Sequence, residues 1–309
     1  MGLFVAAELY CRFWLRMGNP PLHMSHAQIG HLFKPSQDVC RFGQRIQFNA
    51  YSMRSDDFPK EKATSNELRI LFIGDSVING GSLTDQSQLA TELIQQQLKS
   101  DLDRPIVVGN ASAGGWNPTN QLAYVKAFGL FDADLVVLVL SGRYMPKDPT
   151  SRPKIGEDSR FPDHSPILAL QELAFRYLPG YLLRNKPSVS KWPDPRKLTY
   201  EEFKKMYRKP IQTYDAALQL LVSTIRRNDK SLLVAIHPSA REARGAREHG
   251  YGYLLTLLLG MEIQPIHLSK AYVDALDQGS NIYRDWIHLT AMGQQVLANA
   301  LYEPIRNEL

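Results

Sequence analysis

The sequence predicts an α/β sandwich built on a mostly parallel sheet of five strands. Strand-like and helix-like segments alternate from residue 67 to residue 309, which is typical of parallel strands joined by crossover helices. The segment 135–140 is apolar at every position, as expected for a central strand covered on both faces. The chain has 309 residues, of which 44% are hydrophobic and 22% charged, so it can bury a large core.

Each expected element has a local signal. The first strand is a continuously apolar segment that begins at Arg69 and runs into Gly74-Asp75-Ser76, and the other strands are expected at 105–111, 135–140, 231–236 and 263–268. Helices are expected to start at Thr84 or Asp85, at Asn117-Pro118 and at the capping box 199–202, the last with a kink at Pro210. A further helix contains Leu254 and Leu258, and a closing helix covers 290–302.

The domain organisation is an amino-terminal extension, 1–66, followed by the main domain, 67–309. Residues 18–66 predict irregular chain with room for a hairpin near 45–48. Residues 1–15 are apolar but carry Glu8 and Arg12, so they fit either the end of a membrane anchor or a helix packed on the domain. The proline-rich insertion 145–197, with a short helix near 167–177, is expected to form either a wall or lid over the site or a surface loop.

Composition limits the partners and cofactors. The formal net charge of +5 fits a solvated surface better than a dedicated anionic partner, and no nucleic-acid or nucleotide motif is present. The two cysteines, Cys11 and Cys40, match no metal-site spacing, and either a disulfide or two free thiols is compatible with the sequence. We therefore expect no metal and no cofactor.

Ser76 is the candidate nucleophile. It follows a buried strand, and ligands bind outside the carboxyl ends of the strands in open parallel sheets. Gly74 permits a sharp turn before it. A serine nucleophile needs a base and an acid that orients the base. Among eight histidines, His237 and His267 also end strands, but His288 is best placed, because Asp285 lies three residues before it at the start of the closing helix.

Three ordered blocks resemble the SGNH hydrolase (GDSL-like lipase/esterase) superfamily. They are Gly74-Asp75-Ser76, the segment 110–115 (Asn-Ala-Ser-Ala-Gly-Gly) and Asp285-Trp286-Ile287-His288, and the resemblance covers about 67–309. It implies a flavodoxin-like, three-layer α/β/α fold and ester hydrolysis by Ser76, His288 and Asp285. The backbone N–H groups of Ser76 and Gly115 would bind the oxyanion.

A fourth block departs from that family. After the third strand the family usually has Gly-Asn-Asp, whose Asn donates to the oxyanion, whereas this chain has Ser141-Gly142-Arg143-Tyr144. Arg143 either replaces the missing donor, binds an anionic group of the substrate or marks a degenerate site.

The amino-terminal part has an apolar start that carries Glu8 and Arg12, followed by Phe42-Gly43 and the segment 49–54. In these features it is similar to bacterial membrane-anchored GDSL-like proteins, several of which belong to surface-polysaccharide systems and remove or transfer acetyl groups. The sequence therefore predicts an esterase that removes acetyl groups from a carbohydrate, with an O-acetyltransferase or a non-catalytic glycan-binding or assembly protein as alternatives. The expected partner is an acylated carbohydrate or other small ester. Membrane association through the amino terminus and an extracytoplasmic location are expected, with a cytoplasmic location as the alternative.

Overall fold

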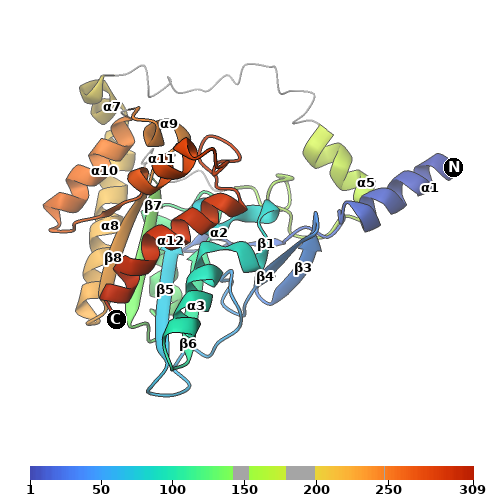
Figure 1. The fold of residues 1–309 in the computed structure, drawn as a ribbon. Helices are drawn as coiled ribbons and strands as arrows, with labels where there is room; N and C mark the ends of the chain where they lie inside the picture. The colour runs from blue at the N-terminus through green and yellow to red at the C-terminus, as the bar shows by residue number, and fades with distance from the viewer. Residues whose placement is uncertain (142–152, 179–198, 247) are drawn as a thin grey trace.

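The structure is a computed structural model that describes residues 1–141, 153–178, 199–246 and 248–309 (Figure 1). Its centre is a five-stranded sheet with the order β6-β5-β7-β8-β9, in which each neighbouring pair is parallel. Numbered along the chain, this is the 2-1-3-4-5 order of flavodoxin-like folds. The strands are β5 (Leu68–Gly74), β6 (Ile106–Ser112), β7 (Leu135–Ser141), β8 (Ser231–His237) and β9 (Ile266–His267). The predicted fold class is confirmed, and this sheet is wholly parallel.

Helices cover both faces of the sheet. Ile70 and Phe72 on β5 face one core, which α3 (Ala90–Asp101), α11 (Ser269–Asp277) and α12 (Ala291–Asn307) complete. Leu71 and Ile73 face the other core, which α4 (Pro118–Phe128), α8 (Arg208–Arg227) and α10 (His249–Gly260) complete. Alternate residues of one strand are therefore buried in different layers, which explains its continuous hydrophobicity. Shorter helices are α2 (Ser76–Asn79), η2 (Gly81–Leu83), η3 (Gln86–Gln88), α7 (Tyr200–Met206) and α9 (Ala240–Ala243).

The amino-terminal extension is more regular than expected, because it forms two hairpins. β1 (His23–His26) pairs with β2 (Gly30–Phe33), and β3 (Gln37–Arg41) pairs with β4 (Gln44–Phe48), all antiparallel. Their inward side chains belong to the same buried core as Leu71 and Leu138 of the sheet; among them are Ile29, Leu32, Ile46 and Phe48. The extension thus packs directly on one face of the main domain.

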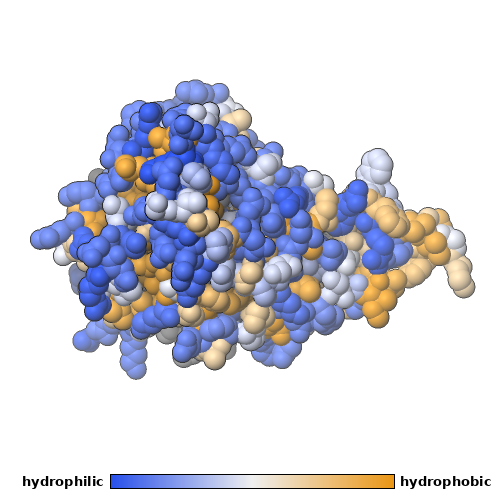
Figure 2. All heavy atoms as spheres, turned by 90° about the horizontal axis from the view of Figure 1, so that it is seen from below, coloured by the Kyte–Doolittle hydropathy of each residue, from blue (hydrophilic) through white to orange (hydrophobic). Residues whose placement is uncertain are grey.

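The first helix packs beside the helical part of the insertion. Glu8 in α1 (Gly2–Leu9) accepts hydrogen bonds from the N–H groups of Ala169 and Leu170, each at 2.9 Å. These residues begin α5 (Ala169–Glu172), which continues as η4 (Leu173–Tyr177). The two segments agree with the helix predicted near 167–177. Many apolar side chains of α1 and η1 (Tyr10–Trp14) remain exposed, which Figure 2 shows as an orange end of the molecule. Among the described helices, none is long and apolar enough to cross a membrane.

The described part of the insertion packs on the extension. The His23 N–H donates to the Pro162 carbonyl at 2.7 Å, and Arg41 of β3 forms a buried ion pair with Glu172 of α5. The remainder of the predicted wall or lid, 145–152 and 179–197, lies outside the described residues. Cys11 is buried, Cys40 is exposed, and both are free thiols.

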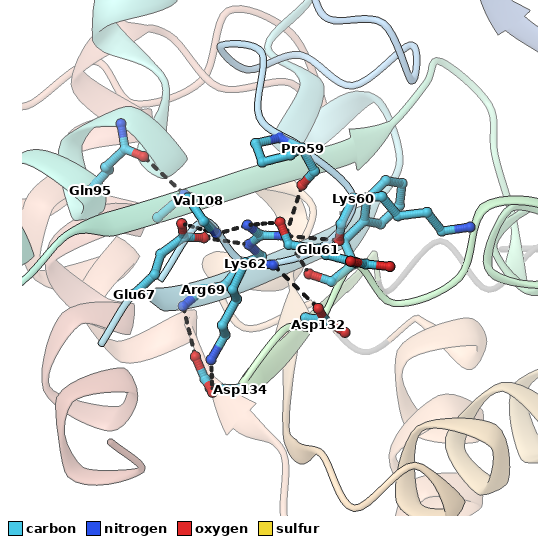
Figure 3. Close-up of polar contacts among 12 residues, drawn as sticks. Pro59, Lys60, Glu61, Lys62, Glu67, Arg69, Gln95, Val108, Asp132 and Asp134 are labelled. Carbon is cyan, nitrogen blue, oxygen red and sulfur yellow. Dashed lines mark hydrogen bonds and ion pairs between the residues drawn. The ribbon is translucent and has the colours of Figure 1, made fainter. Parts of the chain in front are cut away.

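The segment predicted as continuously apolar contains one charged residue, Arg69, and the structure buries it in β5 with only 1% exposure. Figure 3 shows its guanidinium enclosed by backbone carbonyls and by Glu67. Nη1 donates to the carbonyl oxygens of Pro59, Lys60 and Phe131 at 3.0, 2.9 and 2.8 Å. This cluster fastens the chain before the sheet to the end of β5 opposite the candidate site.

Several element boundaries differ from the sequence prediction, and the closing helix, α12, also extends past residue 302 to Asn307. Asp85 caps η3 by accepting from the Ser87 N–H, so α3 starts only at Ala90. The expected kink at Pro210 is a break between two helices, α7 and α8, and Pro210 lies in the first turn of α8, where its missing N–H costs no helical hydrogen bond. The fifth strand, predicted at 263–268, consists of only the two residues of β9.

Candidate active site

Ser76 lies at the carboxyl edge of the sheet, as the first residue of α2. The preceding Asp75 caps this helix by accepting from the Val77 N–H at 2.8 Å, and its second oxygen accepts from Ser141 Oγ at 2.9 Å. Gly74 serves a different purpose from the predicted sharp turn, because a Cβ there would lie 2.6 Å from Ile78 Cγ2. The absence of a side chain lets the new helix pack close to the strand.

Ser76, His288 and Asp285 form a continuous chain of hydrogen bonds. The Ser76 Oγ to His288 Nε2 distance is 2.9 Å, and the His288 Nδ1 to Asp285 Oδ2 distance is 2.7 Å. An ionised carboxylate only accepts, so Nδ1 carries the hydrogen and Nε2 is left to accept the serine hydroxyl proton. The three candidates from the sequence are thus in direct contact, in the order that base-activated serine chemistry requires.

Asp285 is held as a charged acceptor. Partial burial raises the pKa of its carboxyl group. Hydrogen bonds from the N–H groups of His288 and Ile287 and from the imidazole of His288 lower that pKa by more in total, so the net shift is downward. Oδ1 accepts those two N–H groups at 2.8 and 2.9 Å, which leaves Oδ2 for the imidazole. The same short loop therefore fixes the acid and aims the histidine.

His237, the second candidate base, instead supports the loop that carries Asp285 and His288, through a hydrogen bond to its backbone. It is fully buried, and its Nε2 lies 2.8 Å from the carbonyl oxygen of Ile287, so Nε2 must donate. Its Nδ1 lies 3.0 Å from the Tyr272 hydroxyl. Burial lowers the pKa of His237 to about 4. His267, the other alternative, pairs with the Tyr251 hydroxyl at 2.9 Å on the surface.

We expect His237 to make stability depend on pH. The unfolded histidine takes up a proton near pH 6.5, whereas the folded one stays neutral down to about pH 4. The unfolded state therefore binds more protons between these values, and the free energy of unfolding should fall by about 2 kcal/mol from pH 7 to pH 5 through this group. Urea unfolding of wild type and His237→Gln, which keeps an N–H for Ile287 but does not titrate, measures the difference. Equal pH dependence in both proteins would contradict this assignment.

The predicted second block forms a turn next to Ser76. The Trp116 N–H donates to the Ala113 carbonyl at 3.2 Å, and Gly115 has a positive φ of 79°. Gly114, Gly115, Ser76 and His288 line a common cavity of about 250 Å³. Arg143 lies outside the described residues, so its role stays a prediction.

Asn110, the first residue of that block, holds α2, the helix that begins with Ser76. Its Nδ2 donates to the Ile78 carbonyl at 2.9 Å, and Asn79 Nδ2 donates in turn to the Ser112 carbonyl at 3.0 Å. These bonds tie α2 to β6 and fix the position of Ser76 relative to the glycine turn.

Two arginines that were not predicted hold the loop after α2. Arg54 is fully buried and donates to the carbonyls of Asn79 at 2.8 Å, Thr84 at 2.7 Å and Gly81. Burial lowers the pKa of Arg54 to about 9. Arg284 donates to the Gly80 carbonyl at 3.0 Å and so joins this loop to the one that carries Asp285 and His288. Among the described residues, no cluster of three or more His, Cys, Asp or Glu side chains could hold a metal ion.

No protein-family model matches the sequence, and no curated protein matches it. Solved structures resemble the chain in fold. A lipase/acylhydrolase from Enterococcus faecalis is 14% identical, with a TM-score of 0.47 over 78% of this chain and 97% of its own. An acetyl xylan esterase from Geobacillus stearothermophilus is 15% identical, with a TM-score of 0.45 over 77% and 94%. A member of the lipolytic G-D-S-L family from Veillonella parvula is 10% identical, with a TM-score of 0.41 over 76% and 97%. Identities this low concern the fold alone and carry no information about the activity of this chain.

Proposed function

We propose that the protein is a serine esterase of the SGNH type that removes acetyl groups from a carbohydrate. The observation that carries this proposal is the hydrogen-bond chain from Ser76 through His288 to Asp285, which opens into a cavity at the carboxyl edge of the sheet. A non-catalytic binding protein has no need of this arrangement, since a free serine hydroxyl gains its nucleophilicity only from an adjacent base.

The geometry supports a two-step reaction. Ser76 Oγ attacks the ester carbonyl carbon while its proton passes to His288 Nε2. The tetrahedral intermediate collapses as His288 gives that proton to the leaving alcohol, and the acyl group stays on Ser76. Water then attacks the acyl carbon and gives a proton to His288. The bond between the acyl carbon and Ser76 Oγ breaks, the free acid leaves, and His288 returns the proton to Ser76 Oγ. Asp285 stabilises the imidazolium in both steps.

The N–H groups of Ser76 and Gly115 are the proposed donors to the oxyanion. Both residues line the cavity that His288 also lines. Ser76 N–H lies at the first turn of α2, where backbone N–H groups have no partner within the helix and can face a negative charge. Arg143 is proposed as a third donor or as a clamp on the substrate.

The chemistry of the cavity supports a small acyl group on a sugar. Its volume of about 250 Å³ accommodates an acetyl group and part of one sugar ring. Trp116 and Tyr214 provide aromatic surface, and Asn117 and Gln121 provide amide groups beside it. Such a mixture fits a ring that has apolar faces and hydroxyl edges.

The test is hydrolysis of p-nitrophenyl acetate and of an acetylated oligosaccharide by wild type and by Ser76→Ala. We expect acetate release by wild type from both substrates and a loss of about 10⁴-fold or more in kcat in the variant. Turnover that persists in Ser76→Ala, or none in wild type, would overturn the proposal. Adding an unacetylated oligosaccharide separates hydrolysis from transfer, because acetyl transfer to the sugar in excess of acetate release would identify an O-acetyltransferase on the same scaffold.

A further inference from the structure

The amino-terminal hairpin β1–β2 contacts the turn that carries Gly115. His31 Nε2 lies 3.1 Å from the carbonyl oxygen of Gly114, and His31 is only 4% exposed. A carbonyl oxygen can only accept, so Nε2 carries the hydrogen and donates it. The two residues are 83 positions apart in the sequence, so this is a tertiary contact made by the extension and not a part of the turn itself.

The Gly114–Gly115 peptide determines where the Gly115 N–H points. In a trans peptide, the carbonyl and the following N–H point to opposite sides. Because the Gly114 carbonyl is held toward His31, the Gly115 N–H points away from the hairpin. The cavity that both glycines share with Ser76 lies at this turn, so an N–H that points away from the hairpin can face the cavity.

The turn has an accessible alternative. With its bond from Trp116 N–H to the Ala113 carbonyl and a positive φ at Gly115 but not at Gly114, it has the type II pattern. Rotation of the central peptide converts type II into type I, and glycine at both central positions permits either form. In the flipped form the Gly114 carbonyl would occupy the place of the N–H donor and repel an oxyanion.

We propose that His31 is a positioning residue that locks the Gly114–Gly115 peptide in the orientation that offers the Gly115 N–H to the oxyanion. This inference rests on the proposed function. Two further bonds hold the hairpin in place: Trp116 Nε1 donates to the His31 carbonyl at 3.1 Å, and Asn120 Nδ2 donates to the Ile29 carbonyl at 2.7 Å. The extension, which lies outside the central sheet, thereby completes the site.

The test compares His31→Leu, which removes the donor, with His31→Gln, whose amide nitrogen is as many bonds from Cα as Nε2. His23→Leu is the matched control, since His23 lies in the same buried cluster, 6.5 Å from His31 between ring centroids. We expect kcat of His31→Leu to fall about 10-fold at nearly unchanged KM. This loss lies between the effect of one hydrogen bond and the 10²–10³-fold cost of losing an oxyanion donor completely. His31→Gln should recover most of the rate, and His23→Leu should keep the wild-type kcat.

Two outcomes would overturn the inference. One is an equal loss of kcat in His31→Leu, His31→Gln and His23→Leu that follows their loss of stability, because this would indicate a structural role only. The other is a crystal structure of His31→Leu in which the Gly114–Gly115 peptide keeps the wild-type orientation with full occupancy, a result that can be obtained even if the enzyme shows no turnover. Wild-type turnover that Ser76→Ala abolishes tests the proposed function separately.

Discussion

Replacing His288 by alanine should lower kcat for ester hydrolysis by about 10⁴–10⁶-fold, nearly as much as replacing Ser76. Ser76 Oγ hydrogen-bonds to His288 Nε2 at 2.9 Å, and no other histidine described in the structure contacts that hydroxyl. Without the imidazole, the hydroxyl keeps its proton at neutral pH and the leaving alcohol has no acid. In the proposed mechanism His288 and Ser76 act as one unit, so the double variant should be no slower than either single variant.

The controls for this prediction are Asp285→Asn and His267→Ala. Asp285→Asn should lower kcat less, by about 10³–10⁴-fold, because it no longer fixes the hydrogen on Nδ1 of His288 but leaves the base in place. His267 lies on the surface, where it bonds Tyr251, and its removal should leave kcat unchanged. Steady-state kinetics with p-nitrophenyl acetate measure all of them. A His288→Ala variant within tenfold of wild type would mean that another group activates Ser76.

Replacing Arg54 by methionine should lower the free energy of unfolding by about 2–4 kcal/mol. The guanidinium is fully buried and donates to the carbonyls of Asn79, Gly81 and Thr84. Methionine fills much of the same volume, but it leaves these buried acceptors without a donor. Since the loop follows α2 directly, we also expect a lower kcat at temperatures where the variant is fully folded.

Arg45→Met is the matched control for Arg54→Met. Arg45 also lies in the extension, but it is about half exposed and pairs with an exposed Asp38 at 2.8 Å. Such a surface pair contributes about 0–1 kcal/mol, so this variant should unfold at nearly the wild-type urea concentration. If Arg54→Met and Arg45→Met had the same unfolding midpoint, the carbonyl contacts of Arg54 would not contribute to stability.

The sheet could be predicted from sequence because its signals are local. β7 is apolar almost throughout because both of its faces are covered. Each candidate catalytic residue follows a strand or precedes a helix cap. The short loop from Asp285 to His288 was recognisable for the same reason, as its acid and its histidine are three residues apart.

The side chains that hold the loops around the site could not be predicted from the sequence, because their partners are backbone atoms. Arg54 and His31 bind carbonyl oxygens in distant segments, and every residue type offers the same carbonyl. The start of α3 was missed for a related reason, since Asp85 caps a 3₁₀ turn as well as it would cap an α-helix. The sequence places Arg69 at the edge of an apolar strand and gives no sign of its partners, which are carbonyls from other loops.

In the proposed mechanism Ser76 is a nucleophile activated by His288. The most direct test is covalent labelling with a fluorophosphonate, which needs no knowledge of the natural acyl group, followed by mass spectrometry of the peptides. We expect one label, on Ser76, in the wild type and in His267→Ala, and none in Ser76→Ala or His288→Ala. Labelling at another residue, or equally fast labelling of His288→Ala, would mean that Ser76 is not a nucleophile activated by His288.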